Sequence, residues 1–253
     1  MTPPTLSAVL ITLNEEKNVS ECLKALEFCD EIVVVDSGSS DQTVALARSS
    51  GARVFSNAFA DFASQKNFAI GQARGDWVFL IDADERVLPA LRDEIQSVLR
   101  QPEGEGYYVI RLNYIFGRLL KYGDCRRDKQ LRLVRRPIAF FKGLVHERIS
   151  LDSKTRCLKN PLVHVSTPRV TDYMRKLNHY TSLEAQVLKD RQAVFSRAQV
   201  TARPLARFFY LHAAKLGFLD RIEGFLFNVL SAYYEFVRFA KQWELMDKGK
   251  VRS

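Results

Sequence analysis

The sequence lacks several features that would place it in common classes of protein. Its 12 glycines and 8 prolines never cluster among the 253 residues, which excludes collagen-like and low-complexity architectures. No uncharged run approaches the roughly 18 apolar residues that span a bilayer, and Met1–Pro4 carries no basic segment like that of a secretory signal. We therefore expect a cytosolic chain. A sizeable core is expected too, because 47% of the residues are hydrophobic and only 26% are charged.

Cysteine and the common nucleotide motifs are also scarce. The four cysteines form no CxxC pair and have no zinc-site spacing with the four histidines, so the sequence predicts free thiols in a reducing compartment. There is no GxGxxG and no GxxxxGK[ST], which argues against a standard dinucleotide fold and against a P-loop. A nucleotide would have to be bound through other groups.

Charge is unevenly distributed along the chain. Residues 1–100 contain 9 basic and 15 acidic side chains, whereas residues 101–253 contain 29 basic and 14 acidic ones, and the net charge is +9. A solvated basic face is one explanation. The other is an anionic partner, which means a nucleic acid, a phosphorylated lipid or a membrane surface.

Apolar, β-branched runs alternate with segments of helical period in the first hundred residues. The runs predict strands over 6–13, 31–36, 52–57 and 77–81, and the helical periods predict helices over 19–28, 42–50, 62–73 and 89–100. This alternation predicts an α/β fold with an open, mostly parallel sheet flanked by helices. Ligands of such sheets bind beyond the carboxyl ends of the strands.

Three of the predicted strands end in segments that carry carboxylates, namely 12–15, 36–41 and 82–85. Asp82 and Asp84 lie two residues apart just beyond a buried strand, and their oxygens suit Mg²⁺ or Mn²⁺ held together with substrate phosphates. Such a metal would offset the charge of a departing diphosphate. The simpler alternative is a solvated strand end or a helix cap.

Taken together, these segments resemble the inverting glycosyltransferases of family 2, which have the GT-A fold. The resemblance is carried by SAVLITLNEEKNV (7–19), EIVVVDSGSSDQT (31–43), SQKNFAI (64–70) and GDWVFLIDADE (75–85). Over 121–136, 143–149 and 216–245 the chain is similar to lipopolysaccharide core enzymes that add glucose to an inner-core heptose. We expect a Rossmann-like GT-A domain over 1–165, with a nucleotide-sugar half (1–100) and an acceptor-side half (101–165), and an α-helical C-terminal extension over 166–253.

The resemblance implies roles for residues that match the family motifs. Asp36 corresponds to the carboxylate that accepts from the uracil N3–H, and Asp84 corresponds to the metal ligand. The remaining positions implied for UDP-sugar binding are Thr12, Leu13, Asn14 and Glu15 at the uridine and ribose, Lys66 near the base and diphosphate, and Asp82 with Ala83 on the ribose side.

Inverting transfer needs a general base to take the proton of the acceptor hydroxyl. The family places it at Glu147, although Arg148 could instead hold this carboxylate in a structural ion pair. His146 is a candidate for the acceptor or diphosphate pocket, and His164 for the metal site as a neutral imidazole. Core packing is the alternative for both histidines.

The basic second half bears on the acceptor and on the membrane. Residues 118–142 hold nine basic and two acidic side chains, and strand-like alternation places Arg132 on the polar face beside the predicted site, where it would bind acceptor phosphates. From Leu205 onward the chain has the period of amphipathic helices rich in aromatic residues. These helices could pack on the catalytic domain, lie on an anionic membrane or form a dimer interface.

The expected function is transfer of a hexose, glucose by resemblance, from a UDP-sugar to a heptose of the lipopolysaccharide inner core. The enzyme would act with Mg²⁺ or Mn²⁺ at the inner face of the cytoplasmic membrane. One alternative is a GT-A transferase with another saccharide or a polyprenyl phosphate as acceptor. The other is a non-catalytic basic module for nucleic acid, although its usual motifs are absent.

Overall fold

The computed structural model describes residues 4–142, 148–149 and 154–247, and the structural statements below concern these residues. The chain divides into two compact units. Unit 1 comprises Met1–Leu112 and Asp128–His164, and unit 2 comprises Asn113–Arg127 and Val165–Ser253.

The first half of unit 1 is a parallel sheet. Its strands run in the order β3-β2-β1-β4, and their bounds are Leu6–Thr12 (β1), Glu31–Asp36 (β2), Arg53–Ser56 (β3) and Trp77–Leu80 (β4). The intervening helices are α1 (Val19–Lys24), α2 (Thr43–Ser49), α3 (Phe62–Gln72) and α4 (Pro89–Arg100). All eight predicted elements are present, with ends that differ by up to four residues.

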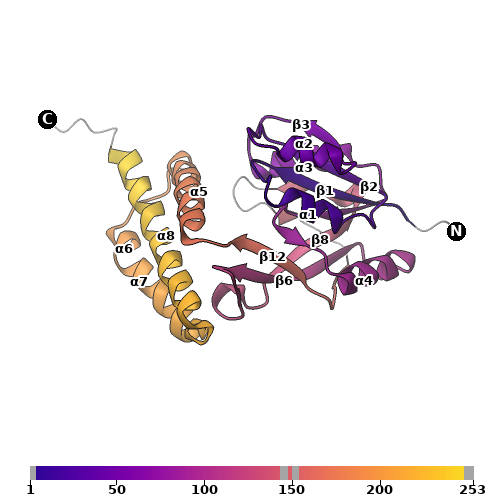
Figure 1. Cartoon of the computed structure of the whole chain (residues 1–253). Helices are drawn as coiled ribbons and strands as arrows, with labels where there is room; N and C mark the ends of the chain where they lie inside the picture. Colours follow the sequence, from indigo (N-terminus) through magenta and orange to yellow (C-terminus); the bar gives the residue numbers. More distant parts are fainter. Residues whose placement is uncertain (1–3, 143–147, 150–153, 248–253) are drawn as a thin grey trace. The chain divides into compact units, whose positions relative to one another are not determined.

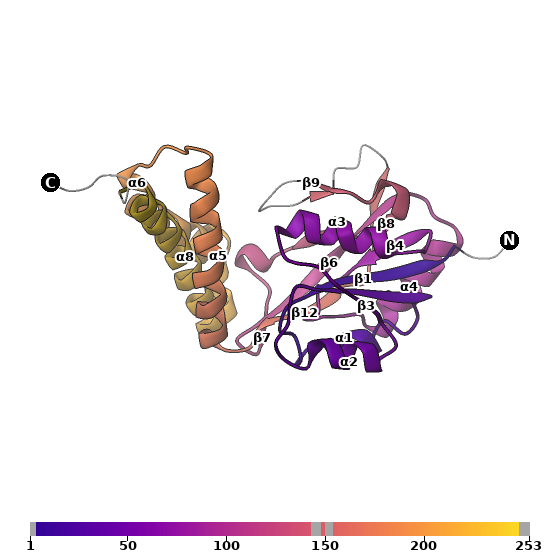
Figure 2. The ribbon, with the colours of Figure 1, turned by 90° about the horizontal axis from the view of Figure 1, so that it is seen from above.

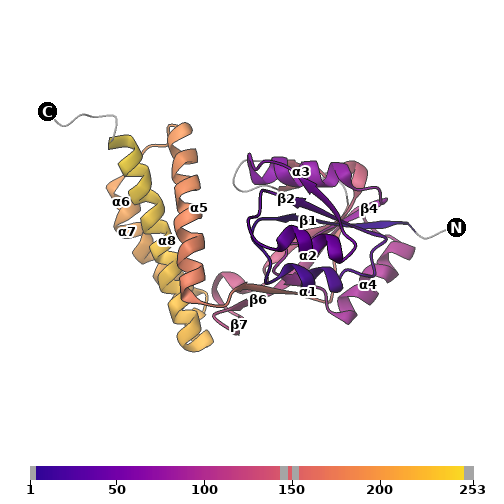
Figure 3. The ribbon, with the colours of Figure 1, turned by 45° about the horizontal axis from the view of Figure 1, so that its top comes forward.

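Helices cover both faces of this sheet, because alternate residues of each strand point to opposite sides. Ala8 and Leu10 of β1 face a core shared with α1 and α4, whereas Val9 faces a second core shared with α3. Figures 2 and 3 show α3 on one face and α1 and α2 on the other. A strand buried on both sides has no polar face, which explains the continuous apolar runs in the sequence.

Beyond β4 the sheet continues with antiparallel neighbours. The full strand order is β3-β2-β1-β4-β8-β6-β12-β5, with β7 and β11 paired to β6. Figure 1 labels β8, β6 and β12 of this second part of the sheet. β8 is antiparallel to both β4 and β6, and β12 is antiparallel to β5. The bounds are Glu85–Arg86 (β5), Gly106–Ile115 (β6), Arg118–Leu120 (β7), Lys129–Arg135 (β8), Thr155–Cys157 (β11) and Leu162–Thr167 (β12); Phe141–Lys142 (β9) and Arg148–Ile149 (β10) form a separate pair. The α/β fold class is confirmed.

Unit 2 is mainly helical. The 27-residue helix α8 (Arg221–Asp247) packs against α5 (Val170–Asp190) and α7 (Ala202–Phe209), and an ion pair of 2.9 Å between Arg238 and Glu184 links α8 to α5. Shorter elements complete the unit: the 3₁₀ turns η1 (Gly123–Cys125) and η4 (Gly217–Asp220), α6 (Arg197–Val200) and the π-turn η3 (Tyr210–Ala214). In the described part of the chain, no helix is both long and apolar enough to cross a membrane.

Residues 113–127 belong to unit 2, although the sequence analysis placed them in the acceptor-side half of the first domain. The reason lies in contacts between segments that are distant in the sequence. The Asp220 carboxylate accepts hydrogen bonds from the backbone amides of Lys121 and Tyr122 at 2.9–3.1 Å, and Arg118 lies 3.8 Å from Glu223 of α8. The basic segment 118–142 is therefore divided between the two units.

Candidate functional site

Asp36 ends β2, and its carboxylate closes the turn that follows. The backbone amides of Gly38 and Ser39 donate to Oδ2 at 2.9 and 2.7 Å, while the hydroxyls of Ser39 and Thr12 donate to Oδ1 at 2.5 and 3.1 Å. Only 3% of Asp36 is exposed. Because two of these four donors are rotatable hydroxyls, the carboxylate can accept from a ligand in exchange for one of them.

The loop after β1 is tied to this same turn. Asn14 adopts φ = 55°, a left-handed conformation that asparagine tolerates better than most residues. The backbone amide of Asn14 donates to Ser39 Oγ at 2.8 Å, and its side-chain Oδ1 accepts from the backbone amide of Ser40 at 2.9 Å. The next amide, that of Glu15, donates to Thr43 Oγ1 at 2.7 Å. Residues 12–15 and 36–43 therefore form one hydrogen-bonded assembly at the carboxyl ends of two parallel strands.

Leu13 lies between these anchored residues, and 51% of it is exposed. An exposed leucine in an otherwise fixed loop is available for apolar contact with a flat ring. This placement is compatible with the uridine role that the resemblance implies for Leu13, which stays a prediction.

Helix α3 brings Lys66 to the same edge of the sheet. The fully buried Gln65 donates to Ser37 Oγ at 2.9 Å and accepts from Asn57 Nδ2 at 2.8 Å, so the start of α3 is fixed against the Asp36 turn. The ammonium of Lys66 lies 5.1 Å from the centroid of the Phe141 ring. Sequence reasoning missed the anchoring role of Gln65, because an isolated glutamine gives no sign of its burial.

A small cavity of about 10 Å³ joins this helix to the ends of β1 and β4. It is lined by Val9, Ile11, Lys66, Leu80, Ile81, Asp82 and Arg132. Lys66, Asp82 and Arg132, three of the predicted site residues, therefore line the same cavity.

Arg132 of β8 holds the carboxylates that follow β4. Its Nη2 donates to Asp82 Oδ2 at 2.7 Å and to Glu85 Oε1 at short range. Glu85 is fully buried, accepts from the Asp82 amide at 2.9 Å and also lies 3.4 Å from Arg111 Nη1. Arg111 in turn pairs with Asp128 at 2.7 Å. An alternating chain of charges thus runs from β6 and β8 to the strand end that carries Asp82.

These contacts set the protonation of the two carboxylic acids. Burial works against the charged form of Asp82, but the Arg132 guanidinium and then Lys66 outweigh it and hold the pKa of Asp82 well below its usual range. Burial raises the pKa of Glu85, with Arg132 and Arg111 opposing that rise. Of these two carboxylic acids, Asp82 is therefore the one that keeps its negative charge over the wider range of pH.

The structure places Arg132 beside the site as expected, but not on an exposed polar face. Only 6% of the residue is exposed, because β8 is inserted between β4 and β6. Glu85, which binds both Arg132 and the Asp82 amide, was not among the predicted site residues. Its one sequence signal is its position directly after the Asp82–Asp84 pair.

Asp84 and His164 form the pair most suited to a divalent cation. His164 Nε2 lies 3.4 Å from Asp84 Oδ2, and their side chains are 13% and 12% exposed. The antiparallel pairing of β12 with β5 sets this distance, because His164 lies opposite Glu85. Ala83, between the two aspartates, is buried, and its carbonyl accepts from Arg86 Nη1 at 2.8 Å.

The chemistry of this donor set fits Mg²⁺ or Mn²⁺. Within residues 4–142, 148–149 and 154–247, no group of three or more histidine, cysteine, aspartate or glutamate side chains is arranged to hold a metal ion. Mg²⁺ is commonly bound by one or two protein ligands, with water and substrate phosphates completing its octahedron. Asp84 and His164 supply such a partial set.

Two predicted residues lie outside the described part of the chain, namely His146 and Glu147. The structure therefore carries no information about the predicted base or its neighbouring histidine. The other predicted positions all belong to unit 1.

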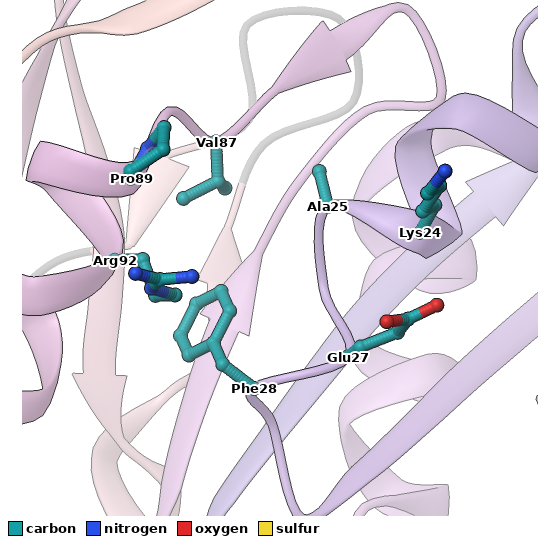
Figure 4. A pocket seen from close by; sticks show the side chains of 7 residues that line it. All are labelled: Lys24, Ala25, Glu27, Phe28, Val87, Pro89 and Arg92. Atoms are coloured by element: carbon teal, nitrogen blue, oxygen red, sulfur yellow. The ribbon is translucent and has the colours of Figure 1, made fainter.

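A second hollow lies apart from these residues. It has a volume of about 230 Å³ and is lined by Lys24, Ala25, Glu27, Phe28, Val87, Pro89 and Arg92 (Figure 4). Its charged groups are Lys24 at the end of α1, Glu27 on the following loop and Arg92 on α4, and none of the predicted site residues lines it. We therefore place the candidate site at the strand ends.

Comparisons with known proteins identify the family of the chain. The family model "Glycosyl transferase family 2" matches residues 7–147. The lipopolysaccharide core biosynthesis glycosyltransferase LpsC of Rhizobium meliloti is 33% identical over 250 residues, which cover 94% of this chain and 92% of that protein. An uncharacterized glycosyltransferase of Rickettsia typhi is 26% identical, with coverage of 97% and 89%.

Solved structures show the same fold. Glucosyl-3-phosphoglycerate synthase of Mycobacterium tuberculosis, crystallised with Mn²⁺, UDP and glucosyl-3-phosphoglycerate, aligns with a TM-score of 0.51 at 21% identity, over 74% of this chain and 79% of that one. This likeness confirms the expected GT-A-type fold. With a family model that spans more than half of the sequence and a relative similar over nearly its full length, the chain belongs to glycosyl transferase family 2.

Proposed function

We propose that this glycosyltransferase moves a hexose from a UDP-sugar to a saccharide of the lipopolysaccharide core, with inversion at the anomeric carbon. The observation that carries the proposal is that Asp36, Asp82 and Asp84 lie at the carboxyl ends of β2 and β4, the two strands that flank β1, with His164 beside Asp84. Membership of an enzyme family argues against the alternative of a non-catalytic module for nucleic acid.

The donor half of the proposal assigns each group a binding task. Thr12, Leu13, Asn14 and Glu15 form the wall at the uridine and ribose. The Asp36 carboxylate exchanges one hydroxyl donor for the uracil N3–H, a proton that cytosine lacks. Asp82 and Ala83 lie on the ribose side. Lys66, which lines one cavity with Asp82, orients and partly neutralises the diphosphate. Arg132, which lines the same cavity, is proposed to contact acceptor phosphates.

Asp84 and His164 would hold a divalent cation in this scheme. The mycobacterial synthase was crystallised with Mn²⁺ and UDP, which supports a metal of this kind. When bound, the cation offsets the negative charge that develops on the departing UDP. His164 serves as a ligand in its neutral form, and the buried Glu85–Arg132 pair keeps the neighbouring Asp82 in place.

Glu147 is the proposed general base. The acceptor hydroxyl attacks the anomeric carbon opposite the leaving UDP and gives its proton to a carboxylate within hydrogen-bond reach. A single such base suffices for an inverting transfer. His146 beside it is assigned to the acceptor or diphosphate pocket.

The identities of the sugar and of the acceptor are the more specific part of the proposal. LpsC is described as a lipopolysaccharide core biosynthesis glycosyltransferase, which supports a saccharide of the lipopolysaccharide core as the acceptor. Glucose as the sugar, an inner-core heptose as the acceptor and the inner face of the cytoplasmic membrane as the place of reaction are proposed from the resemblance over 121–136, 143–149 and 216–245. Another envelope saccharide or a polyprenyl phosphate is the second candidate acceptor.

A transfer assay with two acceptors tests the proposal. Purified full-length protein, radiolabelled UDP-glucose and Mn²⁺ are incubated with lipopolysaccharide truncated after its inner-core heptoses, or with polyprenyl phosphate. We expect label in the lipopolysaccharide and a β-linkage when the donor is α-linked. Label only in the polyprenyl phosphate, or retention of configuration, would contradict the acceptor or the mechanism.

Variants separate the donor site from the base. Asp84→Asn and Glu147→Gln should each lower the rate by about 10²-fold or more, and UDP should still bind to Glu147→Gln. Asp93→Asn is the matched control, because this exposed aspartate of α4 pairs only weakly with Arg92 at the surface. Full activity of Glu147→Gln would show that another group is the base.

A further inference from the structure

Unit 2 exposes a cluster of large apolar side chains around the turn that precedes α8. Of the 20 large hydrophobic residues exposed in the described residues, 13 lie between Leu205 and Met246. Six of them form what we call the apolar patch, each between 41% and 63% exposed: Leu205, Phe209, Phe218, Leu219, Ile222 and Phe225. The surface of a soluble monomeric protein rarely exposes so many large apolar side chains close together unless a partner covers them.

Aromatic contacts link three of the six patch residues. The Phe208 ring lies 5.5 Å from that of Phe209 and 6.0 Å from that of Phe225. His212 lies 6.0 Å from Phe218 and 5.7 Å from Phe225. Phe209 of α7, Phe218 of η4 and Phe225 of α8 are therefore connected through the rings of Phe208 and His212.

The turn before α8 contains two residues in an unfavourable backbone conformation. Leu216 and Arg221 have φ values of 59° and 58°, which are unfavourable for residues other than glycine. A Cβ at Gly217 would lie 2.6 Å from a backbone oxygen. Asp220 fixes the turn from inside by accepting from the amides of Lys121–Tyr122. Strain is thus retained in a turn whose remaining side chains, Phe218 and Leu219 among them, face solvent.

Charge distinguishes between the possible occupants of this surface. Unit 2 contains 19 basic and 9 acidic residues, whereas unit 1 contains 19 and 20. Arg203, Arg207, Lys215 and Arg221 lie within or next to the patch segments. Of the two acidic residues in these segments, Asp220 is buried and Glu223 is partly exposed. Arg203 and Arg207 also pair with Glu235 and Asp124, so Lys215 and Arg221 contribute most of the local positive charge. A second copy of the chain would bring like charge to like charge, while an anionic lipid layer attracts this surface.

We propose that the apolar patch inserts into the headgroup layer of an anionic bilayer, with the surrounding arginines and lysines bound to lipid phosphates. Aromatic and leucine side chains flanked by cations are the composition that favours this interfacial position. The inference deepens the proposed function, on which it rests only for the idea that the acceptor is a membrane glycolipid. It identifies which surface of the protein meets that membrane.

Vesicle flotation of the full-length protein tests the inference. Vesicles contain phosphatidylcholine alone or with a third of phosphatidylglycerol, and each is assayed at 0.1 and 0.5 M NaCl. We compare the wild type with Phe218→Ser/Leu219→Ser and with Val194→Ser. Val194 is the matched control, because it is 84% exposed and lies outside the patch. UDP binding and circular dichroism confirm that each variant is folded.

We expect binding to the anionic vesicles that weakens at high salt. The double variant should lower the partition coefficient by about tenfold or more, because two inserted apolar side chains are lost, whereas Val194→Ser should bind like the wild type. Equal binding by the double variant, or no vesicle binding by the wild type, overturns the inference. So does a dimer in sedimentation velocity that the double variant dissociates without change in vesicle binding. UDP binding reports on the donor site separately.

Discussion

Replacing Arg132 with methionine removes the cation that Asp82 and Glu85 share. The guanidinium lies 2.7 Å from Asp82 Oδ2 and contacts Glu85 Oε1 as well. Methionine retains much of the apolar length of the side chain, so the variant chiefly removes charge and hydrogen bonds. Glu85 is then left with Arg111 at 3.4 Å and with the Asp82 amide.

The size of the effect follows from burial. Glu85 is 0% exposed and Arg132 is 6% exposed, and removal of one partner from a buried ion pair typically costs about 3 kcal/mol or more. In a unit of this size, such a loss lowers the melting temperature by roughly 6–12 °C. Arg92→Met is the control, because its pair with Asp93 is exposed and contributes less than about 1 kcal/mol.

Thermal unfolding followed by circular dichroism measures both variants. The double variant Arg132→Met/Glu85→Gln should recover part of the lost stability, because it removes the carboxylate that the single change leaves poorly compensated. If Arg132→Met melts like the wild type, or if Glu85→Gln worsens it additively, the buried network does not hold this strand end as described.

Three further outcomes follow from the structure. Gly217→Ala should lower the melting temperature of unit 2 by several degrees, since its Cβ would clash with the Leu211 carbonyl; an unchanged melting curve would contradict the close approach. Burial works to raise the pKa of Glu31, but a serine hydroxyl, a backbone amide and an arginine lower it overall. The stabilisation that the charged Glu31 side chain gives the folded protein is therefore complete above the pKa that this group has in the unfolded chain. It is lost as the pH falls through the lower pKa of the folded state. Urea titrations should therefore show a smaller loss of stability between about pH 5 and 3 for Glu31→Gln than for the wild type. Brief alkylation of the native protein should label the exposed Cys157 and spare the buried Cys22, whose pKa burial raises; mass spectrometry of the labelled peptides checks this.

The parallel half of the fold was predictable because its signals are local. Continuous apolar runs such as 31–36 mark strands buried on both faces, and α4 begins and ends where Pro89 and the amphipathic period place it. Helix α1 ends at Lys24, four residues before the expected end. Leu26 is nevertheless fully buried in the following turn, so the apolar period outlasts the helix.

The non-local parts of the site were not predictable to the same degree. Alternation along β8 placed Arg132 near the site, but its burial depends on β4 and β6, which are distant in the sequence. The position of Glu85 directly after the Asp82–Asp84 pair did not indicate its role, because that role arises from contacts with Arg111 and Arg132. The free cysteines, by contrast, agree with the expectation from their spacing.

Isothermal titration of UDP into the full-length protein tests the central claim most directly. Titrations are run in EDTA and in Mn²⁺, with the wild type, Asp84→Asn and the control Asp93→Asn. The account predicts that Mn²⁺ tightens UDP binding by at least about tenfold, that Asp84→Asn abolishes this gain and that Asp93→Asn keeps it. Absence of UDP binding to the wild type in both conditions would contradict the proposed donor site.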